Sequence, residues 1–125
     1  MATRTYKCAR VRGVSVCSPR VLKKISEEER LFSGKPGAAQ VLENIVGLGA
    51  RYIAPPGVTA LDMGVSAAES LMKKLAIQPA GIDAVLFVTQ TPDNMGPSNA
   101  ALLHAKLGLA PDCAALDVNL GCSGY

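Results

Sequence analysis

The residues best suited to chemistry lie near the end of the sequence. Cys122 follows an apolar run, Ala114 to Asn119, that predicts a strand, and Gly121, Ser123 and Gly124 surround the cysteine. These small residues permit a sharp turn from a strand into a helix. At the positive end of a helix a thiolate is stabilised, and free backbone N–H groups can hold an oxyanion. The spacing therefore favours a nucleophile that accepts an acyl group as a thioester.

A second interpretation of Cys122 stays open from the residues alone, because a buried cysteine in a strand-to-helix turn is common. The G-x-S-x-G pattern of esterases is not matched, since Gly121 and Gly124 enclose only two residues. The other cysteines, Cys8, Cys17 and Cys113, have no C-x-x-C spacing, and the chain has one histidine. We therefore expect reduced thiols and no metal site.

Regular alternation of strands and helices begins at Thr59. Apolar residues at helical spacing predict a helix that ends near Leu75, and Ser98 predicts the cap of a second helix that ends at Gly108. Between them, Ile82 to Thr89 reads as a central strand, apolar on both faces and therefore covered on both sides.

The order of these elements predicts an α/β layered domain with parallel strands, the first strand being Arg10 to Cys17. Ligands in such domains bind where the carboxyl ends of strands meet loops. Both Thr89–Pro97 and Gly121–Gly124 follow strands in this way.

Residues 18–58 have an irregular pattern. Ser26–Glu29 predicts a helix start, residues 33–37 predict a loop, and residues 38–46 predict a helix. We interpret this stretch as a surface excursion from a single domain over residues 1–125, with core elements at 10–17 and 59–125.

Composition excludes several classes of protein. Aromatic residues make up 4% and Trp is absent, which argues against a base-stacking nucleic-acid surface, as does a net charge of only +3. No apolar run approaches the roughly 20 residues of a membrane span, and no secretory signal is visible, so we expect a cytosolic protein. Basic residues crowd the first part of the chain, as a solvated face or as a surface for an acidic carrier or a phosphate: Arg4, Lys7, Arg10, Arg12, Arg20, Lys23 and Lys24.

Several short motifs together resemble the N-terminal half of the β-ketoacyl-acyl-carrier-protein synthase III family, the thiolase-fold condensing enzymes. The run that ends in Gly121-Cys122-Ser123-Gly124-Tyr125 is specific when the other motifs precede it. The resemblance covers nearly the whole chain, and the other motifs are Arg10–Cys17, Gly47–Ala54, Thr59–Gly64, Ile82–Asp83, Thr89–Asp93, Pro97–Ser98, Leu107–Gly108 and Asp117.

The resemblance implies a thiolase-like layered α-β-α-β-α fold, of which this chain is roughly the N-terminal half. It implies that Cys122 takes an acyl group from acyl-coenzyme A, a substrate and not a tightly bound cofactor. A malonyl thioester on acyl carrier protein then loses CO2, and its carbanion attacks the acyl-cysteine to give a 3-ketoacyl product, in fatty-acid initiation or a specialised pathway. The backbone N–H of Cys122 contributes to the oxyanion hole, and the family forms cytosolic homodimers.

The sequence departs from the family in three places. The His and Asn that assist decarboxylation belong to the second half of the fold, and His104 corresponds to neither, so we interpret it as a surface or packing residue. Val41 and Gly49 stand where members place a Trp and an Arg against coenzyme A, and Arg51 is interpreted as structural. Gly96 replaces a bulky Phe that reaches the acyl pocket of the dimer partner, which predicts a roomier pocket.

Three functions follow from this resemblance. The first is decarboxylative condensation, the second is acyl transfer to an amine or alcohol without condensation, and the third is a non-catalytic subunit paired with a catalytic homologue. We expect the chain alone to be inactive, with the remaining part of the fold in a second chain or lost by cleavage or truncation.

Overall fold

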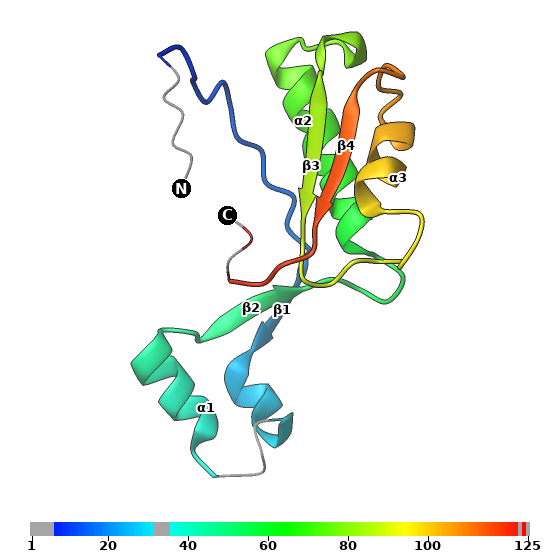
Figure 1. The fold of residues 1–125 in the computed structure, drawn as a ribbon. Coiled ribbons are helices and arrows are strands. Elements are labelled where there is room, and N and C mark those ends of the chain that lie inside the picture. The colour runs from blue at the N-terminus through cyan, green and yellow to red at the C-terminus, as the bar shows by residue number, and fades with distance from the viewer. Residues whose placement is uncertain (1–6, 32–35, 123, 125) are drawn as a thin grey trace. The chain divides into compact units, whose positions relative to one another are not determined.

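The computed structural model describes residues 7–31, 36–122 and 124, which form two compact units (Figure 1). The first unit consists of Met1–Cys17 and Ala60–Tyr125, and the second of Ser18–Thr59. Most of the loop expected at residues 33–37 lies outside the described residues.

The first unit contains the predicted alternation of helices and strands. Helix α2 (Ala60–Leu75) precedes strand β3 (Ala84–Val88), and helix α3 (Asn99–Lys106) connects β3 to strand β4 (Ala114–Val118). A short 3-10 helix, Pro79–Gly81, lies between α2 and β3. The two strands are parallel with Phe87 opposite Asp117, which confirms the predicted parallel pairing.

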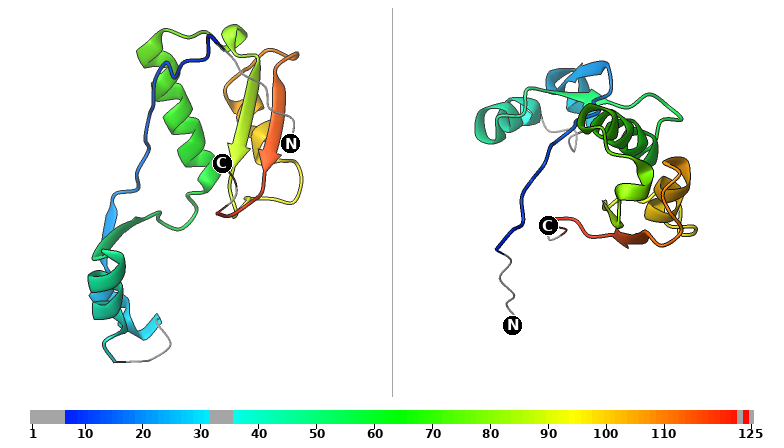
Figure 2. Two further views of the ribbon diagram at one scale, coloured as in Figure 1. Left: turned by 60° about the vertical axis from the view of Figure 1, so that its left-hand side comes forward. Right: turned by 90° about the horizontal axis from the view of Figure 1, so that it is seen from above.

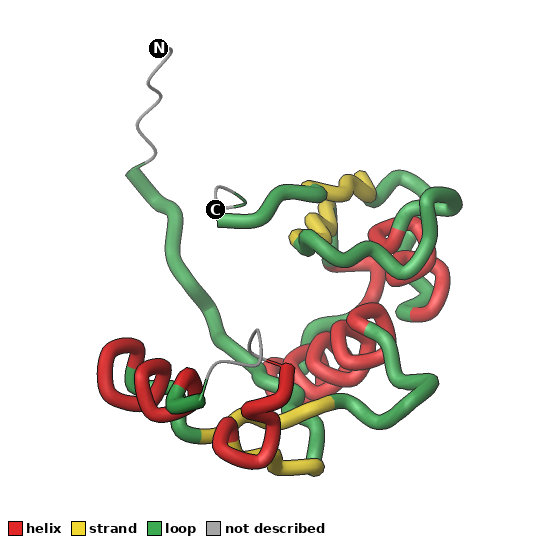
Figure 3. The backbone as a smooth tube through the Cα atoms, turned by 90° about the horizontal axis from the view of Figure 1, so that it is seen from below, coloured by secondary structure: helices red, strands yellow, loops and turns green. Residues whose placement is uncertain are grey.

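Both helices pack on one face of the β3–β4 pair. Phe87 contacts α2 at Gly64, where a Cβ would stand 2.9 Å from Phe87 Cε2, so the glycine allows the close approach of helix and strand. Asp117, opposite Phe87 in the ladder, reaches the start of α3. Figure 2 and Figure 3 show both helices on the same side of the strands. The core of this layer includes Leu61, Ala100, Leu103, Leu109 and Cys113.

The opposite face of the strand pair is open in the described unit. Leu86, Val88 and Leu116 are 61%, 50% and 58% exposed. The prediction that the strand is covered on both sides therefore holds for one face only. The reason is that α2 and α3, the α-helices of this unit's described part, both pack on the face of Phe87 and Asp117.

The strand expected at Arg10–Cys17 does not form, and that prediction is wrong. The segment has no ladder partner among the described residues, and Val11, Val14 and Val16 are more than 70% exposed. At Gly13 a Cβ would stand 3.0 Å from Leu75 Cδ1 and 3.1 Å from Leu71 Cδ1, so the segment lies against α2 there. A β-prone sequence becomes a strand only where a neighbouring strand accepts its hydrogen bonds.

The second unit is a small hairpin with two helical segments. Strand β1 (Val21–Lys24) pairs antiparallel with β2 (Ala50–Ile53), and the 3-10 helix Ile25–Leu31 follows β1 directly. Helix α1 (Ala38–Val41) continues as a π-helix, Leu42–Val46, and ends at Gly47 with φ 74°.

These elements confirm the predicted helical turns near Ser26 and over residues 38–46. The sequence did not reveal the two strands of the hairpin. Both are only four residues long, and β1 is exposed throughout and carries Lys23 and Lys24, so no apolar alternation marks it.

Candidate functional site

Cys122 lies in a tight turn just beyond the carboxyl end of β4, with its side chain exposed. The backbone N–H of Gly124 donates a 3.0 Å hydrogen bond to the carbonyl oxygen of Gly121 and closes the turn around the cysteine. The helix start predicted behind Cys122 falls on residues 123–125, and Ser123 and Tyr125 lie outside the described residues. An exposed thiol in a closed turn has the access that a nucleophile requires.

The two glycines beside Cys122 are explained by close contacts with the neighbouring strand. A Cβ on Gly121 would stand 2.8 Å from Oε1 of Gln90, which follows β3, and a Cβ on Gly124 would stand 2.9 Å from Cγ1 of Val88. Neither glycine has the left-handed backbone that by itself favours glycine. The turn therefore packs directly against the carboxyl end of β3, and larger residues would push it away.

The segment after β3 meets the cysteine turn at the same edge of the sheet. The N–H of Thr89 donates to the Val118 carbonyl at 3.1 Å, which extends the parallel ladder, and Thr91 N–H donates to Thr89 Oγ1 at 3.1 Å. Gln90, between these two threonines, contacts Gly121. The prediction that both loops share the carboxyl edge is confirmed.

Asp117 links the strand that leads to Cys122 with helix α3. Its Oδ2 accepts a hydrogen bond from Asn99 N–H at 2.9 Å, and its Oδ1 accepts one from Ala100 N–H at 2.6 Å. The predicted cap is also present, because Ser98 Oγ accepts from Ala101 N–H at 3.2 Å. Three of the N–H groups at this helix start are thus satisfied by the protein itself, so the start of α3 is closed to an added anion.

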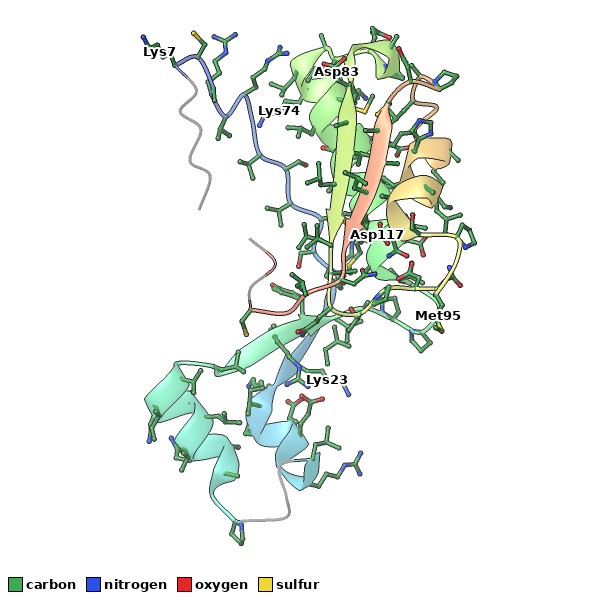
Figure 4. All side chains as sticks on the ribbon, in the orientation of Figure 1. Lys7, Lys23, Lys74, Asp83, Met95 and Asp117 are labelled. Carbon is green, nitrogen blue, oxygen red and sulfur yellow. The ribbon has the colours of Figure 1, made fainter. Side chains whose placement is uncertain are left out.

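Gly96 lies in the loop between β3 and α3, next to the fully exposed Met95 that Figure 4 labels. A Cβ on Gly96 would meet no atom within 4 Å. A larger side chain would therefore fit there in this chain, and the contribution of Gly96 to an acyl pocket stays a prediction.

Two other residues have partners that agree with structural roles. Nε2 of His104 lies 2.9 Å from the Ala110 carbonyl oxygen, and the half-buried ring ties α3 to the chain that follows it. In the second unit, the guanidinium of Arg51 lies 2.7 Å from the carboxylate of Glu28, which is only 7% exposed. Val41 and Gly49 belong to that same unit, and Val41 is 55% exposed.

The four cysteines are free and differ in exposure. Cys8 and Cys122 are exposed, Cys17 is half-buried and Cys113 is buried. Within residues 7–31, 36–122 and 124, no three His, Cys, Asp or Glu side chains lie close enough to hold a metal ion. None of the helices in the described part is long and apolar enough to cross a membrane.

The sequence analysis missed Gln90, Asn99 and Asp117 as residues that shape this site. The role of Asp117 could have been predicted, because an aspartate inside an apolar strand needs hydrogen-bond partners. The role of Gln90 could not, because its proximity to Gly121 follows from the register of the strands.

No protein-family model matches the sequence. The chain is similar over its whole length, at 35% identity, to a putative 3-oxoacyl-[acyl-carrier-protein] synthase 3 of Campylobacter jejuni. It is 42% identical over 79 residues, 63% of the chain and 24% of the relative, to a beta-ketoacyl-[acyl-carrier-protein] synthase III of Sphingopyxis alaskensis. The crystal structure of a 3-oxoacyl-(acyl-carrier protein) synthase from Burkholderia xenovorans matches at 35% identity and a TM-score of 0.78, over 90% of this chain and 32% of that one.

The chain spans 35% of the length of the Campylobacter relative. The sequence resemblance had suggested that the chain is roughly half of the fold, so that estimate was too large. Similarity in sequence and in structure agree, which confirms the thiolase-like α/β fold. Over its whole length the chain is therefore homologous to about a third of a 3-oxoacyl-acyl-carrier-protein synthase III.

Proposed function

We propose that the protein containing this chain is an acyl-thioester condensing enzyme whose nucleophile is Cys122. The observation that carries the proposal is the exposed Cys122 thiol in a glycine turn at the carboxyl edge of two parallel strands. The relatives are named as a putative 3-oxoacyl-[acyl-carrier-protein] synthase and a beta-ketoacyl-[acyl-carrier-protein] synthase, which supports the proposal.

The proposed first half-reaction transfers an acyl group to Cys122. The thiolate attacks the carbonyl carbon of an acyl-coenzyme A thioester, a new C–S bond forms, and coenzyme A leaves as its thiolate and takes up a proton. The backbone N–H of Cys122 supports the oxyanion of the tetrahedral intermediate, which is the usual role of such donors in acyl transfer.

The second half-reaction forms a carbon–carbon bond. A malonyl thioester on acyl carrier protein loses CO2, the electron pair left on its carbon attacks the acyl carbonyl, and Cys122 leaves as the thiolate. The product is a 3-ketoacyl thioester. By resemblance, a His and an Asn in the second half of the fold assist the decarboxylation.

The acyl donor is proposed to be larger than acetyl. Gly96 stands where the family places a bulky side chain, and the space around its Cα is open. The test is the rate of acylation of Cys122 by acetyl and octanoyl thioesters in the protein at its natural full length. A faster octanoyl reaction supports the proposal, and a strong preference for acetyl contradicts it.

The condensation step is tested by adding malonyl-acyl carrier protein to the acylated protein. Mass spectrometry should then detect a 3-ketoacyl carrier product, with one CO2 released for each product formed. Acyl-Cys122 that transfers only to amines or alcohols would favour the alternative acyltransferase. If Cys122 reacts with iodoacetamide at neutral pH no faster than the exposed Cys8, the non-catalytic subunit becomes the better account. A homodimer is also proposed and is measured by light scattering.

A further inference from the structure

A chain of hydrogen bonds continues from Asp117 through the loop to helix α2. Oδ1 of Asn99 accepts a 3.2 Å hydrogen bond from the N–H of Asp93, and Oδ2 of Asp93 accepts a 3.3 Å hydrogen bond from the N–H of Leu61. With the bond from Asn99 N–H to Asp117, this chain connects β4, the start of α3, the 91–97 loop and the start of α2. The proposed condensation chemistry does not use these residues.

Asn99 at the centre of this chain is fully buried, at 0% exposure. Its oxygen is bonded, but its Nδ2 is buried and has no hydrogen-bond partner among the described residues. A buried N–H group without an acceptor lowers stability, so such groups need an explanation beyond packing. The amide oxygen of Asn99 holds the loop through Asp93 N–H, a contact that an apolar side chain of the same size would lose.

The 91–97 loop starts beside the proposed nucleophile. Gln90, which precedes the loop, contacts Gly121, the residue before Cys122. The loop contains Gly96 and ends at the capped start of α3. Figure 4 shows Asp117 on β4 and Met95 on this loop at the same end of the strand pair. The start of the loop therefore adjoins the cysteine turn of the same chain, while Gly96, by the resemblance, faces the acyl pocket of the dimer partner. In the proposed homodimer the position of the loop relative to β4 bears on the acyl pocket at each Cys122.

We propose that Asn99 is a positioning residue that, through Asp93, fixes the 91–97 loop relative to β4 and so sets which acyl chains fit beside Cys122. This inference rests on the proposed acylation of Cys122. Asn99 acts through the loop and does not touch the acyl group, so its loss changes selectivity among acyl donors as well as rate.

The closing experiment compares Asn99→Ala with Ser98→Ala in the protein at its natural full length. Asn99→Ala removes the acceptor for Asp93 N–H and leaves the backbone bond to Asp117 in place. Ser98→Ala removes a different cap of the same helix and leaves the loop tie intact. The readout is the ratio of acylation rate constants for octanoyl and acetyl thioesters.

We expect Asn99→Ala to change this ratio by about tenfold, because a displaced loop slows the acylation by some acyl donors more than by others. We expect Ser98→Ala to leave the ratio nearly constant. An unchanged ratio in Asn99→Ala, or the same change in both variants, overturns the inference. If circular dichroism shows that Asn99→Ala does not fold, Asn99→Leu, which keeps a side chain of similar size and removes the amide oxygen, takes its place with the same expected result.

Amide hydrogen exchange separates failure of this inference from failure of the proposed function. Faster exchange of the Asp93 N–H in Asn99→Ala than in Ser98→Ala supports the tie, and equal exchange contradicts it. If wild-type Cys122 takes no acyl group, the proposed function fails, while the exchange result still decides whether Asn99 holds the loop.

Discussion

The end of the Gln90 side chain lies close against Gly121, the residue before Cys122. A Cβ on Gly121 would stand 2.8 Å from Oε1 of Gln90. The residue after β3 and the residue before the proposed nucleophile are thus placed together by the parallel pairing of β3 and β4.

Gly121→Ala should lower the free energy of unfolding by up to about 1 kcal/mol, because the end of the Gln90 side chain must move to make room. In a Gln90→Ala background the same substitution should cost less, with a coupling of roughly 0.5 kcal/mol or more. Urea denaturation of the two single variants and the double variant measures this. Equal costs in the two backgrounds would show that Gln90 does not exclude the side chain.

Gly64→Ala should destabilise the first unit by about 1–3 kcal/mol, because its Cβ would stand 2.9 Å from the ring of Phe87. The half-buried ring lies against α2, so it or the helix must shift to make room for the added methyl group. Gly81→Ala is the matched control, since its Cβ would meet nothing within 4 Å. The control should stay within about 0.5 kcal/mol of the wild type in urea denaturation, and similar losses in both variants would contradict the packing described here.

Arg51→Ala should destabilise the protein by about 1–3 kcal/mol, because it leaves the buried Glu28 carboxylate without its cation. The matched control is Lys23→Ala, an exposed residue opposite Arg51 in the β1–β2 ladder. The control should cost no more than about 0.5 kcal/mol. Chemical denaturation measures the stability of both variants. If the Arg51 variant is as stable as the Lys23 variant, the ion pair has no structural role, and Arg51 becomes a candidate for ligand binding.

Sequence periodicity was sufficient for α2, β3, α3 and β4, because each has an apolar face that packs locally and clear end signals such as Ser98 and Gly108. It failed for residues 10–17, where strand formation depends on a neighbour elsewhere in the chain, and for the exposed hairpin of β1 and β2. Strand propensity is only a preference for a pleated, half-buried surface, so it decides nothing without that surface.

The site was predictable to a similar degree. Cys122 and its glycines stood out because their spacing serves a known kind of chemistry. The contacts of Gln90, Asn99 and Asp117 arise from the register of β3 against β4 and from the crossing of α3, and residue types alone do not encode register.

The central claim is that Cys122 carries the acyl group, and peptide mapping by mass spectrometry tests it most directly. The protein at its natural full length is incubated with acyl-coenzyme A, digested and searched for acyl adducts on all four cysteines. The account predicts an adduct on Cys122 that hydroxylamine removes, with little on Cys8, which is also exposed and serves as the internal control. Equal acylation of Cys8 and Cys122, or none on Cys122, would contradict it.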